Sequence, residues 1–376
     1  MENGGLLKKR KGIISSIIDP LIEFRITGLD ISDLSMKYVS MDRTKKNKIL
    51  INTFGEITYP EGIIKDGEVK DEQKFTEILK QWFAKEKKKL PSPFVAISLP
   101  EEKSFIRAVQ IPHVKPDDVA NAIRWEIENQ IPLPLEEVIY DYEVIRPLNE
   151  NQDHLDVIIT AFPRDILSAY VRSISGSGLQ IYAIELESQS LMRACLPSLS
   201  NLEAKIVVDI GKTRTSFVIY AGGAILYTST IKSGGLIFEQ YVAKQLNIGK
   251  EEATKLKIEV GLDKTERNGE VFNALAPAIT IIGDELVRAI SYYETHAAHA
   301  HGSTPTIQHI LISGGDANLR GLDTYLASVL KIHVERADPF SAIKDQLAYD
   351  IPPLTRKDAL AYAIAIGLAL RDIRKE

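Results

Sequence analysis

Two short turns in this chain combine one acidic residue with glycine or hydroxyl residues, a composition suited to holding phosphate through a metal ion. The first turn holds Asp30, Ser32 and Ser35, and the second holds Asp209, Gly211, Thr213 and Thr215. Backbone N–H groups in such turns form anion-binding nests, to which the hydroxyls add donors. The carboxylates cannot bind phosphate directly, but they suit Mg²⁺, which binds phosphate oxygens and keeps several waters. The pair therefore predicts a polyphosphate site in which Asp30 and Asp209 hold Mg²⁺ through water.

The two acidic residues occupy the same place in a repeated pattern, 179 positions apart. In each copy a strand runs into the Asp, and two further strands follow after tight turns. The predicted strands are 25–31, 36–41 and 49–54 in the first copy and 205–211, 216–220 and 225–231 in the second. Either turn alone is a common pattern, but a duplication on this scale predicts two similar lobes that face each other.

A third turn, over residues 313–322, follows a predicted strand at 309–313 and contains Gly314 and Gly315. Glycines at the end of a strand let the backbone approach a flat or charged ligand closely. Alone the pattern fits an ordinary strand-to-helix turn. Because it follows the two phosphate turns along the chain, we expect it to be the site for a nucleotide base.

A different unit separates the two copies, a small α+β insert over residues 60–158. Its predicted strands are 94–99, 104–111, 138–145 and 155–160, and a helix after Asp118 carries an apolar stripe formed by Val119, Ile123, Ile127 and Ile131. The other expected parts are a first lobe (26–59 plus 159–202), a second lobe (203–345, with a subdomain near 236–285) and a closing helical segment (346–376) that returns to the first lobe.

The first 25 residues form a separate basic and amphipathic segment. Four basic residues at 8–11 precede apolar residues at helical spacing. This pattern fits a helix lying on an anionic membrane or a short helix packed on protein. Pro20 interrupts the spacing, which favours the packed helix.

Composition excludes several classes of protein. The 376 residues carry 46 Lys and Arg against 51 Asp and Glu, and this net charge of −5 argues against a generally basic nucleic-acid-binding protein. The single cysteine, Cys195, excludes a disulfide framework and a cysteine-based zinc site, and we expect it to be buried. No run approaches the roughly 18 apolar residues of a membrane span. We therefore expect a reduced, cytosolic protein of two or three lobes.

A few other residues invite a functional interpretation. His296, His299 and His301 lie near the end of a predicted helix, where a metal site is the alternative to a plain loop over 297–303. Trp82 and Trp125 fall on predicted helices, and we expect both to pack inside.

The order of the three turns resembles that of the actin-like ATPase superfamily, which includes sugar kinases and Hsp70. The segments that carry the resemblance are 28–31 (Gly-Leu-Asp-Ile), 208–211 (Val-Asp-Ile-Gly) and 312–315 (Ile-Ser-Gly-Gly). Nearly the whole chain is further similar to the PilM family of type IV pilus assembly proteins, relatives of FtsA and GspL, through segments 122–126, 131–137, 184–194, 251–257 and 361–371. The resemblance implies a duplicated, ribonuclease H-like α/β fold, a small α+β subdomain inserted in the first lobe, and ATP with Mg²⁺ between the lobes.

The resemblance also implies roles for individual residues. The first phosphate loop would be Asp30, Ser32, Asp33 and Ser35 followed by Lys37, and the second would be Asp209, Gly211, Lys212, Thr213 and Thr215. Glu187 is the candidate catalytic acid between the lobes, and the adenosine site would comprise Lys257, Gly314, Gly315 and Asn318.

The first loop departs from the family pattern Asp-Ile-Gly-Ser/Thr. Ser32 replaces the glycine, so a Cβ can block the approach of phosphate, and Asp33 adds a negative charge that can repel it. Lys212 and Arg214 across the cleft would offset this repulsion. We therefore expect ATP binding with weak or absent hydrolysis.

The partner implied by the resemblance is the short cytosolic N-terminal tail of the inner-membrane protein PilN, held in a groove at the inserted subdomain. Helix 119–131 and strands 94–99 and 105–111 would supply the floor of that groove or a free edge for strand pairing. This partner would hold the protein at the inner face of the inner membrane. Pilus motor ATPases and self-association are further expectations, and nucleic acid is not expected.

The alternative function is a small-molecule kinase or ATPase of the same superfamily. A kinase needs a base and a pocket at the acceptor hydroxyl. The insert has no recognisable sugar-binding sequence, which argues against a sugar kinase.

Overall fold

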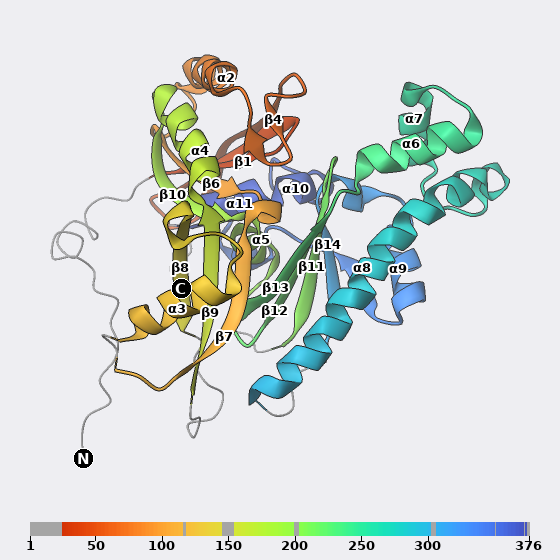
Figure 1. Cartoon of the computed structure of the whole chain (residues 1–376). Coiled ribbons are helices and arrows are strands. Elements are labelled where there is room, and N and C mark those ends of the chain that lie inside the picture. Colours follow the sequence, from red (N-terminus) through yellow and green to blue (C-terminus); the bar gives the residue numbers. More distant parts are fainter. Residues whose placement is uncertain are drawn as a thin grey trace.

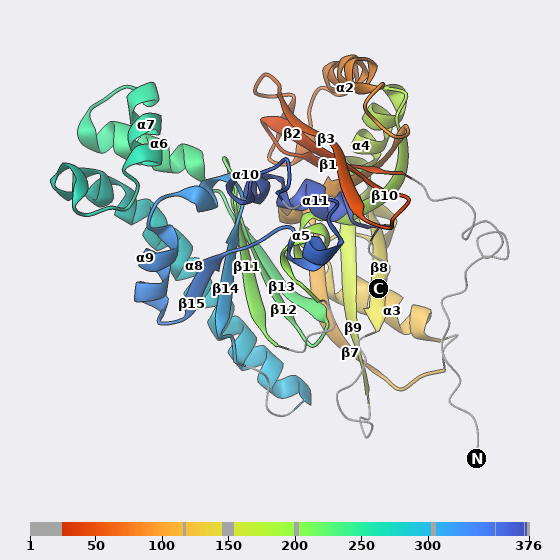
Figure 2. The same cartoon turned by 180° about the vertical axis from the view of Figure 1, so that it is seen from behind.

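The computed structural model of the chain describes residues 25–115, 118–144, 154–198, 203–301, 306–349, 351–371 and 373, apart from the side chains of 296–301. The predicted N-terminal segment 1–25 lies outside these residues except for Arg25. The described strands form two five-stranded sheets, one in each lobe, a three-stranded sheet beside the first lobe and a small two-stranded sheet (Figures 1 and 2). None of the helices in this part of the chain is both long and apolar enough to cross a membrane.

The sheet of the first lobe has the strand order β10-β6-β1-β2-β3. Its strands are β1 (Thr27–Ile31), β2 (Ser35–Arg43), β3 (Ile49–Thr58), β6 (Phe94–Leu99) and β10 (Gln180–Leu186). β1 runs antiparallel to β2 and parallel to β6. Helices α2 (Glu72–Glu86) and α4 (Arg164–Gly176) pack together over one face of this sheet, around a core that includes Phe75 and Tyr170.

The sheet of the second lobe repeats this arrangement, with the order β13-β12-β11-β14-β15. Its strands are β11 (Lys205–Ile210), β12 (Thr215–Ala221), β13 (Ala224–Ile231), β14 (His309–Ser313) and β15 (His333–Arg336). β11 runs antiparallel to β12 and parallel to β14, as β1 does to β2 and β6. The repeated order and directions confirm the predicted duplication and the two-lobed α/β fold.

The second lobe also contains four helices, namely α6 (Gly235–Leu246), α7 (Lys250–Glu259), α8 (Glu270–His301) and α9 (Leu322–Leu330). Short elements complete the chain: β4 (Ile64–Lys65), β5 (Glu68–Val69), α10 (Arg356–Ala359) and the 3₁₀ turns η1 (Glu101–Lys103), η2 (Leu135–Glu137), η3 (Glu266–Gly269), η4 (Gly315–Asn318), η5 (Ser341–Gln346) and η6 (Leu360–Tyr362). The expected loop at 297–303 is wrong for residues 297–301, because α8 extends through this alanine-rich stretch.

The structure corrects the start of the predicted insert. β6 pairs with β1 on one side and β10 on the other, so residues 94–99 belong to the first lobe. The separate sheet has the order β7-β9-β8 and comprises β7 (Phe105–Pro112), β8 (Val138–Val144) and β9 (His154–Pro163). An apolar run such as 94–99 fits a strand buried on both faces of any sheet, so the sequence alone could not assign it to one.

Helix α3 (Val119–Gln130) packs on the sheet of the insert and confirms the predicted apolar stripe. Ile123 and Ile127 are fully buried there. Trp82 is also buried as expected, but the expectation for Trp125 is wrong, because its side chain is 66% exposed. Trp125 points away from the stripe, since it lies two positions from both Ile123 and Ile127 on the helix.

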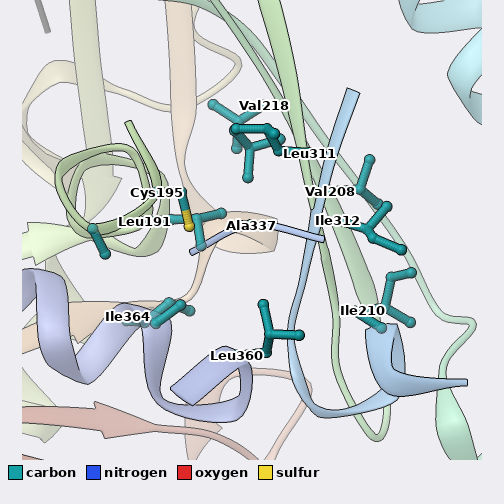
Figure 3. Packing of buried hydrophobic residues seen from close by; sticks show 14 of the residues in the cluster. Leu191, Cys195, Val208, Ile210, Val218, Leu311, Ile312, Ala337, Leu360 and Ile364 are labelled. Carbon is teal, nitrogen blue, oxygen red and sulfur yellow. The ribbon is translucent and has the colours of Figure 1, made fainter. Parts of the chain in front are cut away.

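A continuous core joins the two lobes through α5 (Glu187–Cys195) and α11 (Ala363–Ala369). Figure 3 shows Leu191 and Cys195 gathered with Val208 and Ile364 in this core. α11 lies so close to β1 that a Cβ added at Gly28 would be 2.2 Å from the carbonyl oxygen of Ala365. The C-terminal segment therefore packs on the first lobe through backbone contact that only glycine permits.

Candidate functional site

The two predicted phosphate turns are hairpin loops with the same backbone geometry. In the first, the N–H of Ser32 donates to the carbonyl of Ser35 at 2.9 Å, and in the second the N–H of Gly211 donates to the carbonyl of Arg214 at 2.9 Å. The strand register places Asp30 and Asp209 at matching positions before the two turns. The turns are therefore equivalent elements of the duplicated fold.

A cavity of about 320 Å³ lies between the lobes and brings most of the predicted site residues together. The predicted residues that line it are Asp30, Ser32, Ser35, Lys37, Glu187, Asp209, Gly211, Lys212, Thr213, Gly314 and Gly315. Residues that the predicted site did not include also line it, namely Leu34, Glu56, Thr58, Arg214, Ser216, Leu360, Ala361, Ala363 and Ile364. Both phosphate turns, the acidic residue between the lobes and the glycine turn thus meet at one cavity.

Two residues of the predicted phosphate loops point elsewhere. The carboxylate of Asp33 accepts the backbone N–H groups of Asp66 and Gly67, at 3.2 and 3.0 Å. Its negative charge is therefore held by the neighbouring loop and does not line the cavity. The hydroxyl of Thr215 is buried and donates to the carbonyl of Ser233 at 2.7 Å.

Two residues of the predicted adenosine site also lie outside the lining of the cavity. Lys257 is buried, and its Nζ lies 3.0 Å from Glu239 Oε1 and 2.5 Å from Asp316 Oδ1. The amide of half-buried Asn318 donates to the carbonyl of Lys357 at 2.9 Å. The cavity consequently reaches the glycine turn but not these two side chains.

Burial dominates the electrostatics of the acidic groups that line the cavity. It raises the pKa of Asp209 to about 7, and the nearby charge of Asp30 adds to this shift. The positive charges of Lys37 and Arg214 lower the pKa of Asp209 and partly offset this rise. Burial also raises the pKa of Asp30, and it raises the pKa of Glu187 to about 8. Near pH 7 Glu187 is therefore mostly protonated and Asp209 about half protonated, and a divalent cation would displace these protons.

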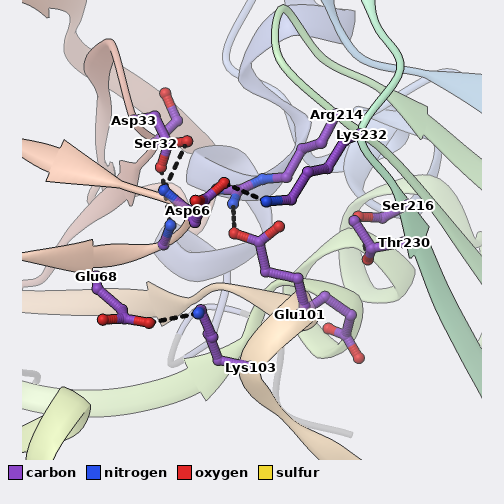
Figure 4. A network of polar contacts seen from close by, with 12 residues as sticks. Ser32, Asp33, Asp66, Glu68, Glu101, Lys103, Arg214, Ser216, Thr230 and Lys232 are labelled. Atoms are coloured by element: carbon purple, nitrogen blue, oxygen red, sulfur yellow. Dashed lines mark hydrogen bonds and ion pairs between the residues drawn. The ribbon is translucent and has the colours of Figure 1, made fainter. Parts of the chain in front are cut away.

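Arg214 reaches from the second turn to the first lobe. Its guanidinium lies 2.5 Å from Glu102 Oε1 and 3.6 Å from Glu187 Oε1, and the residue is only 9% exposed. Figure 4 shows Arg214 next to Lys232, which makes a second ion pair between the lobes with Asp66. Arg214, which occupies the position that Ser35 has in the first turn, was expected across the cleft as a positive charge, but its pairing with Glu102 was not.

These features define the class of protein: two duplicated lobes with paired hairpin turns at the cavity between them form the actin-like ATPase fold. The structure of MreB5 of Spiroplasma citri bound to ADP has this fold, with a TM-score of 0.54 and 14% sequence identity, over 91% of this chain and 94% of that chain. The ethanolamine utilization protein EutJ from Carboxydothermus hydrogenoformans has a TM-score of 0.53 and 17% identity, over 93% of this chain and 91% of that chain.

The family comparison is more specific. The profile of the family "Type IV pilus assembly protein PilM" matches residues 28–373, so the chain belongs to this family of pilus assembly proteins. The solved structure of a PilM-PilN type IV pilus biogenesis complex matches with a TM-score of 0.76 and 21% identity, over 94% of this chain and 99% of that chain.

Proposed function

We propose that this pilus assembly protein binds ATP with Mg²⁺ in the cavity between its lobes and acts as a nucleotide-binding scaffold. The observation that carries the proposal is the meeting of two equivalent turns, each preceded by a buried Asp, at one cavity. The cavity of about 320 Å³ lies at the lower end of the range for ligand pockets. MreB5, which shares the fold, was solved bound to ADP.

The donors at the cavity fit a metal-bound polyphosphate. Lys37, Lys212 and Arg214 bring positive charge to the cavity for phosphate oxygens, although they now pair with Glu56, Glu239 and Glu102 and would have to share or exchange these partners. Asp30 and Asp209 supply the oxygen ligands that Mg²⁺ prefers. Gly314 has φ +88°, and a Cβ there would lie 2.3 Å from the carbonyl oxygen of Ile210, so a side chain is excluded where the adenosine is expected. Lys257 and Asn318 would take part only after they exchange their present partners.

Weak or absent hydrolysis forms part of the proposal. Glu187, the candidate catalytic residue, is 7% exposed, and burial raises its pKa to about 8. Near pH 7 its carboxyl is mostly protonated, so it is a poor general base for activating water. The guanidinium of Arg214 lies 3.6 Å from Glu187 Oε1, and its charge limits this rise of the pKa but does not reverse it.

Calorimetric titration with ATP and Mg²⁺ tests the nucleotide site. Asp209→Asn keeps the shape of the side chain but removes the charge that orients the metal, so we expect affinity to fall about tenfold or more. Asp141→Asn, an exposed change in the insert, is the matched control and should leave affinity unchanged. Equal affinity in Asp209→Asn and the parent protein would remove the second turn from the site.

The same proposal can be separated from the kinase alternative by thermal shift. Nucleotides that bind only the native state raise its melting temperature, and the rise grows with the logarithm of the ligand concentration relative to its dissociation constant. A scaffold should respond to ATP and ADP and not to a panel of sugars. Stabilisation by a sugar, alone or together with ATP, would instead favour a small-molecule kinase.

We further propose that the insert binds the N-terminal tail of a PilN-like membrane protein by pairing with the outer edge of β8. Among the described strands β8 pairs only with β9, so its other edge is open to an added strand. Tyr142 and Val144 are exposed and share one face of β8, where alternate side chains of an added strand would lie.

This edge replaces the edges expected from the sequence. β6 is paired on both sides and offers none, and β7 lies against β13 of the second lobe. The apolar face of α3 forms the core of the insert and is not free. The solved PilM-PilN complex supports a PilN-like partner; motor ATPases and self-association stay predictions of the family resemblance.

A fluorescent peptide copying a PilN tail tests the docking edge. Tyr142→Asp combined with Val144→Asp should abolish binding, because charge replaces the apolar contacts on one face of the added strand. Val287→Asp, at an exposed apolar position of α8, is the matched control. Full binding by the double variant would place the groove elsewhere. Both the double variant and the control should bind ATP as the parent protein does, so the peptide proposal and the nucleotide proposal can be tested separately.

A further inference from the structure

Three residues with metal-binding side chains lie together on β14 and on its parallel neighbour β15, the edge strand of the second sheet. Figure 2 shows these two strands side by side. His309 is directly opposite His333 in the strand register, and Glu335 follows His333 by two positions, on the same face of β15. One ligand atom from each residue lies within 4.8 Å of the others. The strand pairing itself therefore brings the three donors together.

These side chains are available to a ligand. The side chains of His333 and Glu335 are 59% and 54% exposed, with His333 Nε2 and Glu335 Oε2 3.9 Å apart. The rings of His309 and His333 are in contact, with centroids 5.4 Å apart. In the described part of the chain none of the three side chains makes a hydrogen bond. A bound ion would therefore displace water and no existing protein partner.

The charges around the cluster are compatible with a cation. Lys205 on β11 is the neighbour of His309 in the register, but its Nζ lies 3.2 Å from Glu203 Oε2. Its positive charge is thus compensated by a local carboxylate. The carboxylate of Glu335 supplies the negative charge that a dication needs from its own ligand set.

We propose that His309, His333 and Glu335 form a surface site for a divalent transition-metal ion such as Zn²⁺. Two imidazoles and a carboxylate match the donor preferences of Zn²⁺ and its neighbours, whereas Mg²⁺ requires oxygen ligands. Three protein ligands leave a tetrahedral ion one position for water or for a donor from another molecule. His333 and Glu335 lie on β15, the edge strand of the sheet, so that position faces solvent.

This site is separate from the cavity between the lobes. His309 begins β14, while the cavity is lined by Gly314, just beyond the other end of that strand. At about 3.3 Å per residue, the two sites are roughly 16 Å apart along the strand. Zn²⁺ binding and nucleotide binding can therefore be measured independently.

The test is a calorimetric titration of the full chain with ZnCl₂ in excess Mg²⁺, which saturates oxygen-only sites. We expect one Zn²⁺ per chain, and at least about a tenfold loss of affinity in His309→Ala and in His333→Ala, because each removes a direct ligand. Glu335→Gln should weaken binding less than either histidine change. His113→Ala, an exposed histidine of the insert, is the matched control and should leave the titration unchanged.

Two results would overturn the proposal. Unchanged Zn²⁺ affinity in both histidine variants would assign the ion to other residues, with His296, His299 and His301 as the next candidates. Displacement of Zn²⁺ by Mg²⁺ at equal concentration would show that the ion is bound by oxygen ligands only and not by the two imidazoles. Replacement of Zn²⁺ by Co²⁺ gives a second readout, since tetrahedral Co²⁺ absorbs strongly in the visible range and this absorption should be lost in His333→Ala.

Discussion

The two phosphate turns share one backbone frame, but their side chains are opposite in charge. The first turn contains Asp33 where the second has Lys212, and Ser35 where the second has Arg214. In the first turn the hydroxyl of Ser32 is itself bonded to the carbonyl of Ser35, at 2.9 Å. The comparison teaches that duplication preserved the frame that positions a ligand, while the positive charge at the turns is concentrated in the second lobe.

A second contrast concerns the strands that lead into the turns. Gly28 of β1 corresponds by the 179-residue offset to Val207 of β11. Both residues are central in their sheets, but Gly28 lies against the backbone of α11, whereas Val207 has a fully buried side chain in the core. The lobes therefore differ in how their sheets are covered, although the order of their strands is the same.

Removal of the cation that links the lobes should have the largest effect. Arg214→Met leaves Glu102 and Glu187 without their partner in a mostly buried environment, and we expect a loss of about 3–5 kcal/mol in the free energy of unfolding. Ser35→Ala, the matching change in the first turn, should cost less than about 1 kcal/mol. Chemical denaturation measures both. Equal losses of stability in the two variants would contradict the proposed difference between the turns, in which only the second turn links the lobes.

The strand contrast predicts the next effect. Gly28→Ala adds a Cβ that overlaps the carbonyl oxygen of Ala365, so α11 must move, at a cost of about 3 kcal/mol. Gly249→Ala is a control at a glycine with no atom within 4 Å of an added Cβ, and it should be close to neutral. The melting temperatures of the two variants give the comparison. A Gly28→Ala protein as stable as its control would contradict the tight packing.

The acidic pair makes stability depend on pH. The folded-state pKa values of Asp209 and Glu187 are raised to about 7 and about 8, so the stability they contribute is present below pH 4 and is lost as pH rises through these values. Without ligand, we expect the free energy of unfolding to fall by several kcal/mol, on the order of 5, between pH 5 and pH 8, because each pH unit below a raised pKa is worth about 1.4 kcal/mol per carboxyl. Asp209→Asn should flatten this fall, as should Mg²⁺ with ATP. Stability that instead rises over this range would exclude protonated carboxyls at the cavity.

The smallest effect is expected for a substitution that gives the first turn the glycine of the second turn. Ser32→Gly restores in the first turn the residue type found at Gly211, and we expect affinity for ATP with Mg²⁺ to stay equal or improve within about twofold. The reverse change, Gly211→Ser, adds a Cβ 3.1 Å from the carbonyl oxygen of Arg214 and should weaken binding. Titrations of the two variants measure the difference. A large loss in Ser32→Gly would instead identify Ser32 as a donor to the ligand.

Much of the fold was predictable because the duplication is visible in local sequence patterns. A strand ending in Asp30 or Asp209, followed by a tight turn, needs only local propensity and spacing to be recognised. The sequence could not assign residues 94–99, because the choice between two sheets depends on pairing partners far along the chain. The prediction for Trp125 was wrong for a different reason, because it ignored the helical spacing, which places Trp125 away from the apolar stripe of Ile123 and Ile127.

The candidate site was predictable in its turns and less so in its charges. The residue types at the two turns and at Gly314 follow from backbone requirements that select glycine or small polar residues, so they can be recognised in the sequence. The partners of Asp33 and Lys257 do not, because each side chain bonds to a group brought close only by the tertiary fold. Arg214 was expected across the cleft as a compensating charge, but its ion pair with Glu102 in the other lobe depends on the tertiary fold and could not be predicted.

The position of α11 has a consequence for the order of folding during synthesis. Val39 and Met41 of β2 belong to the core that α11 completes, and both are almost fully buried in the finished protein. The ribosome releases β1 and β2 long before it releases α11. The face of the first sheet that α11 covers is therefore exposed to solvent while the second lobe is synthesised. A nascent chain arrested before residue 363 should therefore be cut by protease in β1–β3 and protected in β11–β15. The lobe that is translated first is the lobe that is finished last.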